Sequence, residues 1–249
     1  MEIVIGSTRE LMGRLAADDA AKRIAAAIAA NGVARVVFAS AASQFEFLKA
    51  LVAHKEIDWT KVCGFHLDEY LGLAADHPAS FRRFLRERLL ERLPNPMRSF
   101  TFVEGDAPDA AAECARLAAA VRERPIDLAC IGIGENGHIA FNDPPADFNS
   151  PNAYNPVTLD EVCRHQQYGE GWFPTMDAVP KIAISMSVPQ IFSAKIIINT
   201  VPDTRKAKAV QAAVEGPVTN MCPASILQTH PDCRLFLDKP AASLLTKKY

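Results

Sequence analysis

Two short stretches of the sequence carry side chains that transfer protons. Asp68 lies in the stretch Phe65 to Tyr70, and His138 and Asp143 follow the glycines of the stretch Gly132 to Asp143. A carboxylate and an imidazole can both accept and donate protons near neutral pH. Asp143 follows His138 by five residues, so we expect its carboxylate to hydrogen-bond the imidazole and bias its charge. The two stretches therefore predict a site for acid–base catalysis.

Both stretches also have an ordinary structural interpretation. Asp68 would then cap a turn or the next helix, which is a frequent role of aspartate. His138 would be a hydrogen-bonded histidine of the core, and the pattern from Gly132 to Gly137 is only a weak dinucleotide signature. The residue types alone leave these interpretations open.

A third stretch, Asn199 to Lys206, ends in the cations Arg205 and Lys206 at the start of an expected helix. Helix N-termini attract anions through free N–H groups and the helix dipole, so we expect a phosphate group there. A solvated basic patch is the alternative, and Asp203 is expected to be a helix cap. The sequence contains no close-spaced zinc ligands, serine elbow or Walker lysine. It therefore favours metal-free proton transfer, such as isomerisation of a phosphorylated sugar.

The elements that position these residues alternate between short apolar segments and longer segments of helical period. This alternation predicts an α/β fold with a mainly parallel sheet covered by helices on both faces. Each of the three stretches directly follows an expected strand, which is where an open parallel sheet binds ligands. The expected strands are Glu2 to Ile5, Ala34 to Ala39, Val62 to Leu67, Ser99 to Val103, Leu128 to Ile133, Lys181 to Met186, Lys195 to Asn199 and Arg234 to Leu237. The expected helices are Arg9 to Ala30, Ser43 to His54, Ala79 to Leu93, Ala107 to Arg122, Pro189 to Ser193, Thr204 to Val214 and Ala224 to His230.

The segment 144–178 departs from this alternation because it is rich in proline and has weak periodicity. A long connection of this kind is usually functional, so we expect a lid over the site. The alternative is a surface excursion packed by its own aromatic side chains. Length favours a single domain over residues 1–249.

Composition excludes several classes of protein. The chain has 249 residues, is 49% hydrophobic and carries a formal net charge of −2, so disorder, a membrane span and nucleic-acid binding are all disfavoured. The six cysteines include no CxxC pair, and the N-terminus lacks the pattern of a signal peptide. We therefore expect reduced thiols, a cytoplasmic location, and no nucleic-acid or membrane partner.

Several ordered motifs together resemble the glucosamine-6-phosphate deaminase family. The resemblance spans nearly the whole chain. It rests on Phe65 to Leu73, His77-Pro78, Ser80 to Arg82, Gly132 to Pro144, Val179 to Lys181, Gln211 to Gly216 and Ser225 to Pro231.

The resemblance implies a modified Rossmann-like three-layer sandwich and a reaction without metal or organic cofactor. Glucosamine 6-phosphate and water would become fructose 6-phosphate and ammonia. Asp68 matches the carboxylate that shuttles a proton between C2 and C1, and His138 matches the group that opens the sugar ring. Asp143 stands where the family has a glutamate that works with this histidine. Asn136 stands where many members have an aspartate. Lys206 matches the family's phosphate-binding lysine.

The phosphate-binding loop and the lid depart from the family pattern. The family's glycine-rich phosphate loop reads Ala41-Ala42-Ser43-Gln44 here, and Glu170 replaces an arginine of the lid. Glycine-free backbone has fewer ways to wrap an anion, and a carboxylate repels a phosphate. Arg82, Arg83, Arg164 and Arg205 are candidate replacement cations. The expected substrate contacts are Ser40, Ala42, Ser43, Glu69, Gly137, Glu170 and Lys206.

Substrate identity stays open at this point. A galactosamine 6-phosphate deaminase-isomerase and a 6-phosphogluconolactonase are the enzymatic alternatives, and a non-catalytic sugar-phosphate sensor is the third. Asp68 distinguishes them, because isomerisation needs it as a base and lactone hydrolysis needs only an activated water. The region after Asp143 lacks the cations that regulated family members use, so we expect no such allostery. We expect a monomer or a small homo-oligomer.

Overall fold

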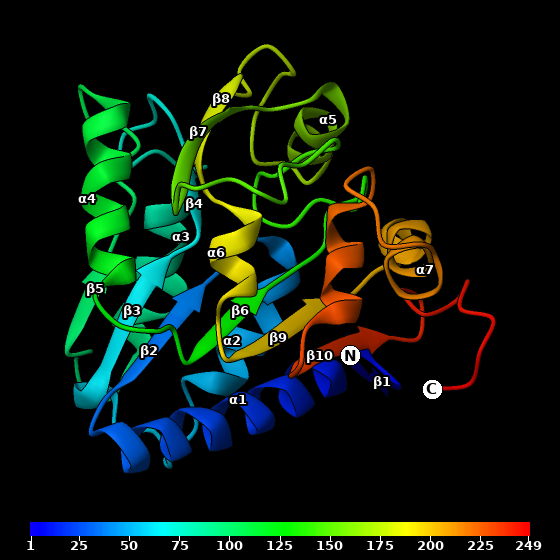
Figure 1. Cartoon of the computed structure of the whole chain (residues 1–249), viewed down its shortest axis with the longest axis horizontal. Coiled ribbons are helices and arrows are strands. Elements are labelled where there is room, and N and C mark those ends of the chain that lie inside the picture. Colours follow the sequence, from blue (N-terminus) through cyan, green and yellow to red (C-terminus); the bar gives the residue numbers. More distant parts are fainter.

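The computed structural model describes residues 1–249, and a seven-stranded sheet runs through its centre (Figure 1). The strand order is β1-β10-β9-β6-β2-β3-β5, and every neighbouring pair is parallel. The strands are β1 (Glu2–Gly6), β2 (Ala34–Phe38), β3 (Val62–His66), β5 (Ser99–Thr101), β6 (Leu128–Ile131), β9 (Ile196–Val201) and β10 (Cys233–Asp238). The predicted α/β class with a mainly parallel sheet is confirmed.

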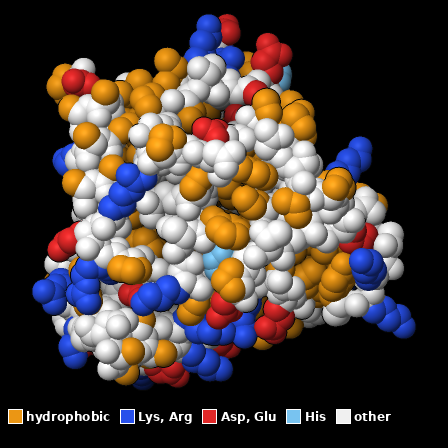
Figure 2. Space-filling model, viewed as in Figure 1, with side chains coloured by type: hydrophobic (Ala, Val, Ile, Leu, Met, Phe, Trp, Pro, Cys, Tyr) orange, Lys and Arg blue, Asp and Glu red, His pale blue; other side chains and the backbone are white.

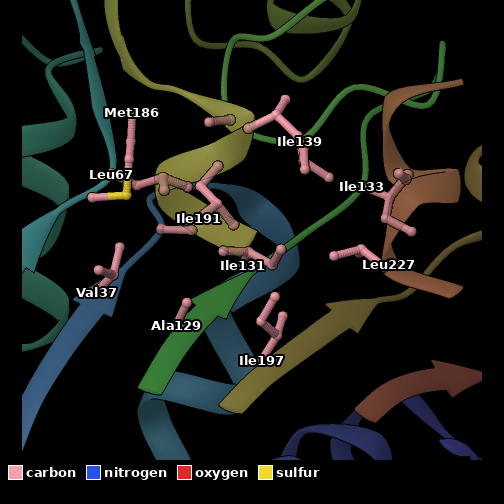
Figure 3. Packing of buried hydrophobic residues seen from close by; sticks show 14 of the residues in the cluster. Val37, Leu67, Ala129, Ile131, Ile133, Ile139, Met186, Ile191, Ile197 and Leu227 are labelled. Carbon is pink, nitrogen blue, oxygen red and sulfur yellow. The ribbon is translucent and has the colours of Figure 1, made fainter. Parts of the chain in front are cut away.

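Helices cover both faces of this sheet and complete the three layers (Figure 1). Side chains of the buried strands alternate between the faces: Val36 and Phe38 of β2 pack under α1, and Val37 belongs to the opposite cluster. Figure 3 shows this opposite cluster, where Ile191 of α6 lies beside Ile131 of β6. One face carries α1 (Arg9–Asn31), α2 (Phe45–Leu51) and α3 (Phe81–Arg88), and the other carries α4 (Ala110–Arg122), α6 (Val188–Phe192) and α7 (Ala207–Glu215).

A second, three-stranded antiparallel sheet lies beside the first. It has the order β4-β8-β7, with β4 (Asp68–Tyr70), β8 (Ile182–Met186) and β7 (Tyr154–Thr158). The prediction that the segment from Lys181 to Met186 belongs to the parallel sheet is therefore wrong. This strand reads as a buried parallel strand because Ile184 faces one hydrophobic cluster and Ala183 faces another.

The segment 144–178 contains regular structure that the sequence did not predict. β7 lies in it, and α5 (Glu161–Gly169) follows with Asp160 as its N-cap, whose side chain accepts from the Cys163 N–H. The proline-rich composition conceals the strand, because β7 is an edge strand and tolerates Pro156. The segment is thus a strand and a helix joined by loops.

Four expected helices, including the one from Thr204 to Val214, are shorter in the structure or have a different geometry. Short 3₁₀ segments replace their ends or the whole helix: η1 (Ala42–Gln44) before α2, η3 (Leu90–Arg92) after α3, and η5 (Pro223–Thr229) in place of the last helix. η2 (Trp59–Lys61) precedes β3, and η4 (Thr204–Lys206) precedes α7. No helix is both long and apolar enough to cross a membrane. On the face in Figure 2, basic and acidic side chains are interspersed.

The strand order reverses between β2 and β6. From β2 the chain proceeds outward through β3 and β5, and it then returns to place β6 on the other side of β2. In open α/β sheets, ligands bind beyond the carboxyl ends of the strands at such a reversal. The fold therefore directs attention to the loops after β2 and β6.

Candidate active site

A cleft opens at the carboxyl ends of β2, β6 and β9. It encloses about 690 Å³ including the solvent at its open mouth. The predicted site residues that line it are Ser40, Ala42, Ser43, Asp68, His138, Glu170 and Lys206. The structure thus brings together residues from all three sequence stretches.

Asp68 is a buried carboxylate whose side chain lines the cleft. It lies on β4, opposite Ser185 of β8, is only 5% exposed, and accepts no hydrogen bond from any group of the chain. Burial, reinforced by the neighbouring Glu69 carboxylate, raises the pKa of Asp68 well above its ordinary value. A carboxylate of this kind is a stronger base than one in water, and a ligand in the cleft is its available partner.

The ring of His138 lies directly over Gly134. A Cβ at residue 134 would lie 2.1 Å from Cε1 of His138, so only glycine leaves room for the imidazole. The Gly134 N–H donates to the His138 carbonyl over 2.9 Å, which closes the loop. Gly137 has a φ of +85°, and a Cβ there would lie 2.9 Å from Sγ of Cys222. The two glycines therefore set the position of the imidazole.

Asp143 and Asn136 lie behind His138, on the side away from the cleft. Oδ1 of Asp143 is 3.1 Å from Nδ1 of His138 and also accepts from Nδ2 of Asn136 over 2.9 Å. The Asp160 N–H donates to Oδ2 of Asp143 over 3.0 Å. Burial acts to raise the pKa of Asp143, but contacts with His138, Asn136 and the Asp160 N–H outweigh it and the pKa is lowered. Asp143 is therefore an ionised carboxylate that can stabilise a protonated imidazole.

The cleft also contains a buried ammonium group, that of Lys206. Nζ of Lys206 lies 3.8 Å from Oε1 of Glu170 and 3.9 Å from Oε1 of Glu135. Burial lowers the pKa of Lys206, although both carboxylates oppose this shift. Glu170 itself is held by Nε2 of Gln166 and Nε1 of Trp172 at 2.9 and 3.1 Å. Because neither carboxylate is within hydrogen-bond distance of Nζ, the ammonium protons remain available to an anion.

Ser40 presents a hydroxyl to the cleft from the end of β2. Its Oγ lies 3.3 Å from Nε2 of His66, while Nδ1 of His66 accepts from the Val103 N–H over 3.4 Å. Nε2 therefore carries the ring proton and donates to Ser40. Burial lowers the pKa of His66 to about 3, so this imidazole stays neutral. The hydroxyl proton of Ser40 is free to bind a ligand.

Side chains anchor the loop that lacks glycine. Nε2 of Gln44 donates to Oγ of Ser43 and to Oγ1 of Thr200, over 3.1 and 2.8 Å. The guanidinium of Arg9 donates to the carbonyl of Ala42. These bonds tie η1 to the ends of β1 and β9, so the loop keeps a fixed shape at the cleft.

Comparison with known proteins agrees with this geometry. The family model of glucosamine-6-phosphate isomerases/6-phosphogluconolactonase matches residues 7–235. This chain belongs to that family. A glucosamine-6-phosphate deaminase of Lactobacillus delbrueckii subsp. bulgaricus is 34% identical over 245 residues, which cover 98% of this chain and 100% of that protein. One from Listeria innocua is 39% identical over 200 residues, which cover 80% and 83% of the two chains.

Solved structures of the glucosamine-6-phosphate isomerase/6-phosphogluconolactonase family have the same fold. A monomeric glucosamine-6-phosphate deaminase superposes with a TM-score of 0.90 at 31% identity, covering 98% of this chain and 100% of that one. A 6-phosphogluconolactonase from Shewanella baltica superposes with a TM-score of 0.79 at 20% identity, covering 96% and 97%. The second likeness is one of fold alone.

Glu69 is not in the cleft of this family member, so the prediction that it contacts substrate is wrong. The side chains of β4 alternate, and Glu69 points to the side opposite Asp68, where it is fully buried. Its carboxylate accepts from the N–H groups of Tyr70, Phe81 and Arg82 and from the hydroxyl of Ser80. Glu69 therefore binds the start of α3. Gly137 does not line the cleft either, and its place is the turn before His138.

Of the four arginines predicted as replacement cations, one lies at the cleft of this family member. Arg205 lines it. Arg82 is buried in ion pairs with Glu104 and Asp106 at 2.6 and 2.8 Å, so it is neither a ligand-binding cation nor solvated. The remaining two are engaged elsewhere: Arg83 pairs with Glu87 and Arg164 donates to the carbonyls of Met176 and Val179.

Three polar side chains of the cleft were missed in the sequence. Arg9 lies at the first turn of α1, which begins after the cap of Thr8, and lines the cleft. Its position after an expected strand was the available signal. Gln166 and Gln167 also line the cleft; the first accepts from the Glu135 N–H and the second from the Tyr70 hydroxyl. No local pattern in the sequence gives the orientation of α5 that directs them inward.

Proposed function

We propose that this chain is an amino-sugar-phosphate deaminase/isomerase that converts glucosamine 6-phosphate and water to fructose 6-phosphate and ammonia. One observation carries the proposal: an unpartnered carboxylate, Asp68, lines the same cleft as His138, which is paired with Asp143. Proton transfer between adjacent carbons needs a base without competing partners, and ring opening needs an imidazole that can be charged. The activity that names the curated relatives uses this chemistry.

The first step is ring opening. His138, charged and stabilised by Asp143, donates a proton to the ring oxygen and takes up the proton that the C1 hydroxyl loses, so that C1 becomes the aldehyde carbonyl. Oδ1 of Asn136 accepts from the backbone N–H of His138 over 3.0 Å and Nδ2 of Asn136 donates to Asp143, so Asn136 fixes the position of both residues. The open-chain 2-amino aldehyde is then the substrate of Asp68.

The second step moves a proton between two carbons. The Asp68 carboxylate removes the proton from C2 while protonated His138 donates its proton to O1, which leaves an enolamine, and protonated Asp68 then gives its proton to C1. The resulting C2 iminium adds water and expels ammonia to give the 2-ketose, and the proton released returns to His138. The raised pKa of Asp68 favours the protonated intermediate of this shuttle.

The remaining groups of the cleft fit the phosphate end of the substrate. Lys206, Arg9 and Arg205 supply positive charge, and Ser40 and Ser43 supply hydroxyl donors. Glu170 and Glu135 offset part of this charge. We propose that Glu170 holds the ammonium of Lys206 in place and lowers the affinity for a phosphate dianion.

Ammonia release is the experiment that tests the function. The purified chain and an Asp68→Asn variant are incubated with glucosamine 6-phosphate and, separately, galactosamine 6-phosphate. Release that depends on Asp68 supports the proposal, and the preferred sugar gives the configuration at C4. Hydrolysis of 6-phosphogluconolactone by both proteins would favour the lactonase instead. Sugar-phosphate binding without any turnover would indicate a sensor.

The proposal also covers the domain, the lid, the cellular location and the oligomeric state of the enzyme. It acts as one domain over residues 1–249, with the segment 144–178 closing over the cleft and carrying Gln166, Gln167 and Glu170 into it. The six cysteines are all free, which suits a reducing cytoplasm. A monomer or small homo-oligomer without metal or organic cofactor suffices for the steps above, and size-exclusion chromatography with light scattering measures its state.

A further inference from the structure

A cluster of three metal-binding side chain types lies behind the cleft. Nδ1 of His138, a carboxylate oxygen of Asp143 and Sγ of Cys163 all lie within 4.8 Å of one another. The three residues come from the catalytic loop and from α5, and 25 positions separate the first from the last. Sequence spacing could not reveal this cluster, because the ligands of zinc sites are recognised in sequences only when they are close together.

One of these groups makes no hydrogen bond. His138 is 7% exposed, and its Nδ1 forms an ion-pair contact with Oδ1 of Asp143 at 3.1 Å but has no hydrogen-bond partner within the chain. Cys163 is fully buried, although its neighbours include the charged Asp143 and Asp160. A buried nitrogen lone pair or N–H without a partner calls for an explanation. A cation bound between the three side chains would satisfy them.

We infer that His138, Asp143 and Cys163 form a site for a zinc-like divalent cation, and that its occupation blocks the imidazole. An imidazole nitrogen, a thiolate and a carboxylate are the ligands that Zn²⁺ prefers, whereas Mg²⁺ and Ca²⁺ prefer oxygen alone. Three protein ligands leave a fourth position for water.

The geometry needs only a small adjustment. Zinc bonds of about 2.0–2.3 Å in a tetrahedron place ligand atoms about 3.3–3.8 Å apart. The His138–Asp143 separation of 3.1 Å is close to this range, and the outer limit of 4.8 Å for the cluster requires Cys163 to approach by about 1 Å. Nδ2 of Asn136 donates to Asp143 and to Asp160 over 2.9 Å each, so a second layer already orients the carboxylate.

An acidic cleft leads to the cluster from the side opposite the substrate. Asp143 and Asp160 line this second cleft together with Asp147, and no lysine or arginine lines it. Such a surface raises the local concentration of cations. Since His138 lines the substrate cleft and Asp143 lines the acidic one, the cluster forms the wall between them.

Occupation of the site changes the chemistry of His138. A cation on Nδ1 uses the lone pair that would otherwise be protonated, so the imidazolium no longer forms. It also neutralises the carboxylate of Asp143 that stabilises that charge. The inhibition rests on the proposed function, whereas the existence of the site does not.

Direct metal binding is the first measurement. The reduced, metal-free full-length chain is titrated with Zn²⁺ in competition with a chromophoric chelator, and we expect one site per chain. Cys163→Ser should weaken zinc binding by more than the roughly 10–100-fold that the loss of an outer-layer partner costs. Cys222→Ser is the matched control, because Cys222 is also buried beside the His138 loop but lies outside the cluster, and its zinc affinity should stay unchanged.

Cobalt(II) substitution identifies the ligand. A thiolate-to-cobalt charge-transfer band in the near ultraviolet is expected for the unmodified chain and for Cys222→Ser, and it should be absent from Cys163→Ser. Equal zinc affinity of the unmodified chain and Cys163→Ser, or a cobalt band that survives in Cys163→Ser, overturns the inference whatever the enzyme turns out to catalyse. Circular dichroism confirms that the variants are folded.

The deaminase assay then tests the consequence. Zn²⁺ should inhibit ammonia release by the unmodified chain, and a chelator should restore it. Cys163→Ser should resist inhibition by the same concentration. If zinc binds at the site and ammonia release persists, the metal site is supported but the proposal that zinc blocks His138 is refuted.

Discussion

Two aspartates of the site occupy opposite environments. Asp68 is buried on β4 without a hydrogen-bond donor, and its pKa is raised by burial and by the nearby Glu69. Asp143 is almost as well buried, but Asn136 and the Asp160 N–H donate to it and His138 adjoins it, so its pKa is lowered. The same functional group therefore has a raised proton affinity in one place and a lowered one in the other.

This difference separates two roles. A carboxylate that takes up and returns a proton needs a raised pKa, whereas one that stabilises a cation must keep its charge. Environments that move two titratable groups apart in this way are a general feature of acid–base sites. The comparison thus supports our proposal that Asp68 shuttles the proton and that Asp143 supports His138, and each of the following variants tests it.

Asp68→Asn has the largest expected effect. The amide has nearly the same shape but cannot accept a proton, so turnover of the amino-sugar phosphate should fall by about 10³-fold or more. Binding of the sugar phosphate, measured by calorimetry, should change little. Asp127→Asn is the control, because Asp127 is also a buried aspartate but does not line the cleft; its kcat should stay within a few-fold. Undiminished turnover in Asp68→Asn would refute the assignment.

Asp143→Asn should have a smaller effect on the same reaction. The imidazolium of His138 loses its carboxylate partner, but the imidazole itself remains, so we expect kcat to fall by about 10²-fold. Asp143→Glu keeps the charge and should retain most activity. Steady-state kinetics of the three proteins provides the test, and a loss in Asp143→Glu as great as in Asp143→Asn would show that position matters more than charge.

The sequence predicts the surroundings of Asp143 better than those of Asp68. Gly134, His138 and Asp143 lie within twelve positions after β6, so the loop and its pair could be predicted from local spacing. The environment of Asp68 could not, because it depends on the pairing of β4 with β8, which lies more than a hundred positions away. Apolar composition alone does not tell a buried parallel strand from an antiparallel one.

The same limit explains the errors about Glu69 and the arginines. Glu69 follows Asp68 directly, and a one-residue step on a strand reverses the direction of a side chain. No sequence pattern shows that β4 is a strand, since it has only three residues. Arg82 likewise reads as a surface residue until the fold places Glu104 and Asp106 beside it.

Lys206→Ala tests whether substrate binding can be separated from the proton transfer that we propose for the two aspartates. Lys206 lines the cleft but takes no part in the proposed proton transfers, so its loss should raise KM by about 10–100-fold through a missing charged hydrogen bond and leave kcat within a few-fold. Glu170→Gln removes the opposing charge and should lower KM a few-fold. A fall of kcat in Lys206→Ala as large as that in Asp143→Asn would show that Lys206 contributes to proton transfer as well as to binding.

Protein stability gives the smallest and most direct contrast between the two aspartates. The folded pKa of Asp68 is raised, so the native state loses stability as pH rises above the ordinary value of 3.8, and Asp68→Asn should melt a few degrees higher at pH 7. The folded pKa of Asp143 is lowered, so its contribution is present above 3.8 and is lost as pH falls through the folded value. Asp143→Asn should therefore melt a few degrees lower at pH 7. The Asp68→Asn difference should shrink as the pH falls toward 3.8, because the carboxyl is then protonated in both the folded and the unfolded state. The Asp143→Asn difference should begin to shrink only below 3.8, because the unfolded state is protonated first while the folded carboxyl is still ionised. Thermal unfolding compares the melting temperature of each variant with that of the unmodified chain at pH 7 and at pH 3.5. Melting temperatures that shift in the same direction in the two variants at pH 7 would mean that the environments of the two carboxylates do not differ.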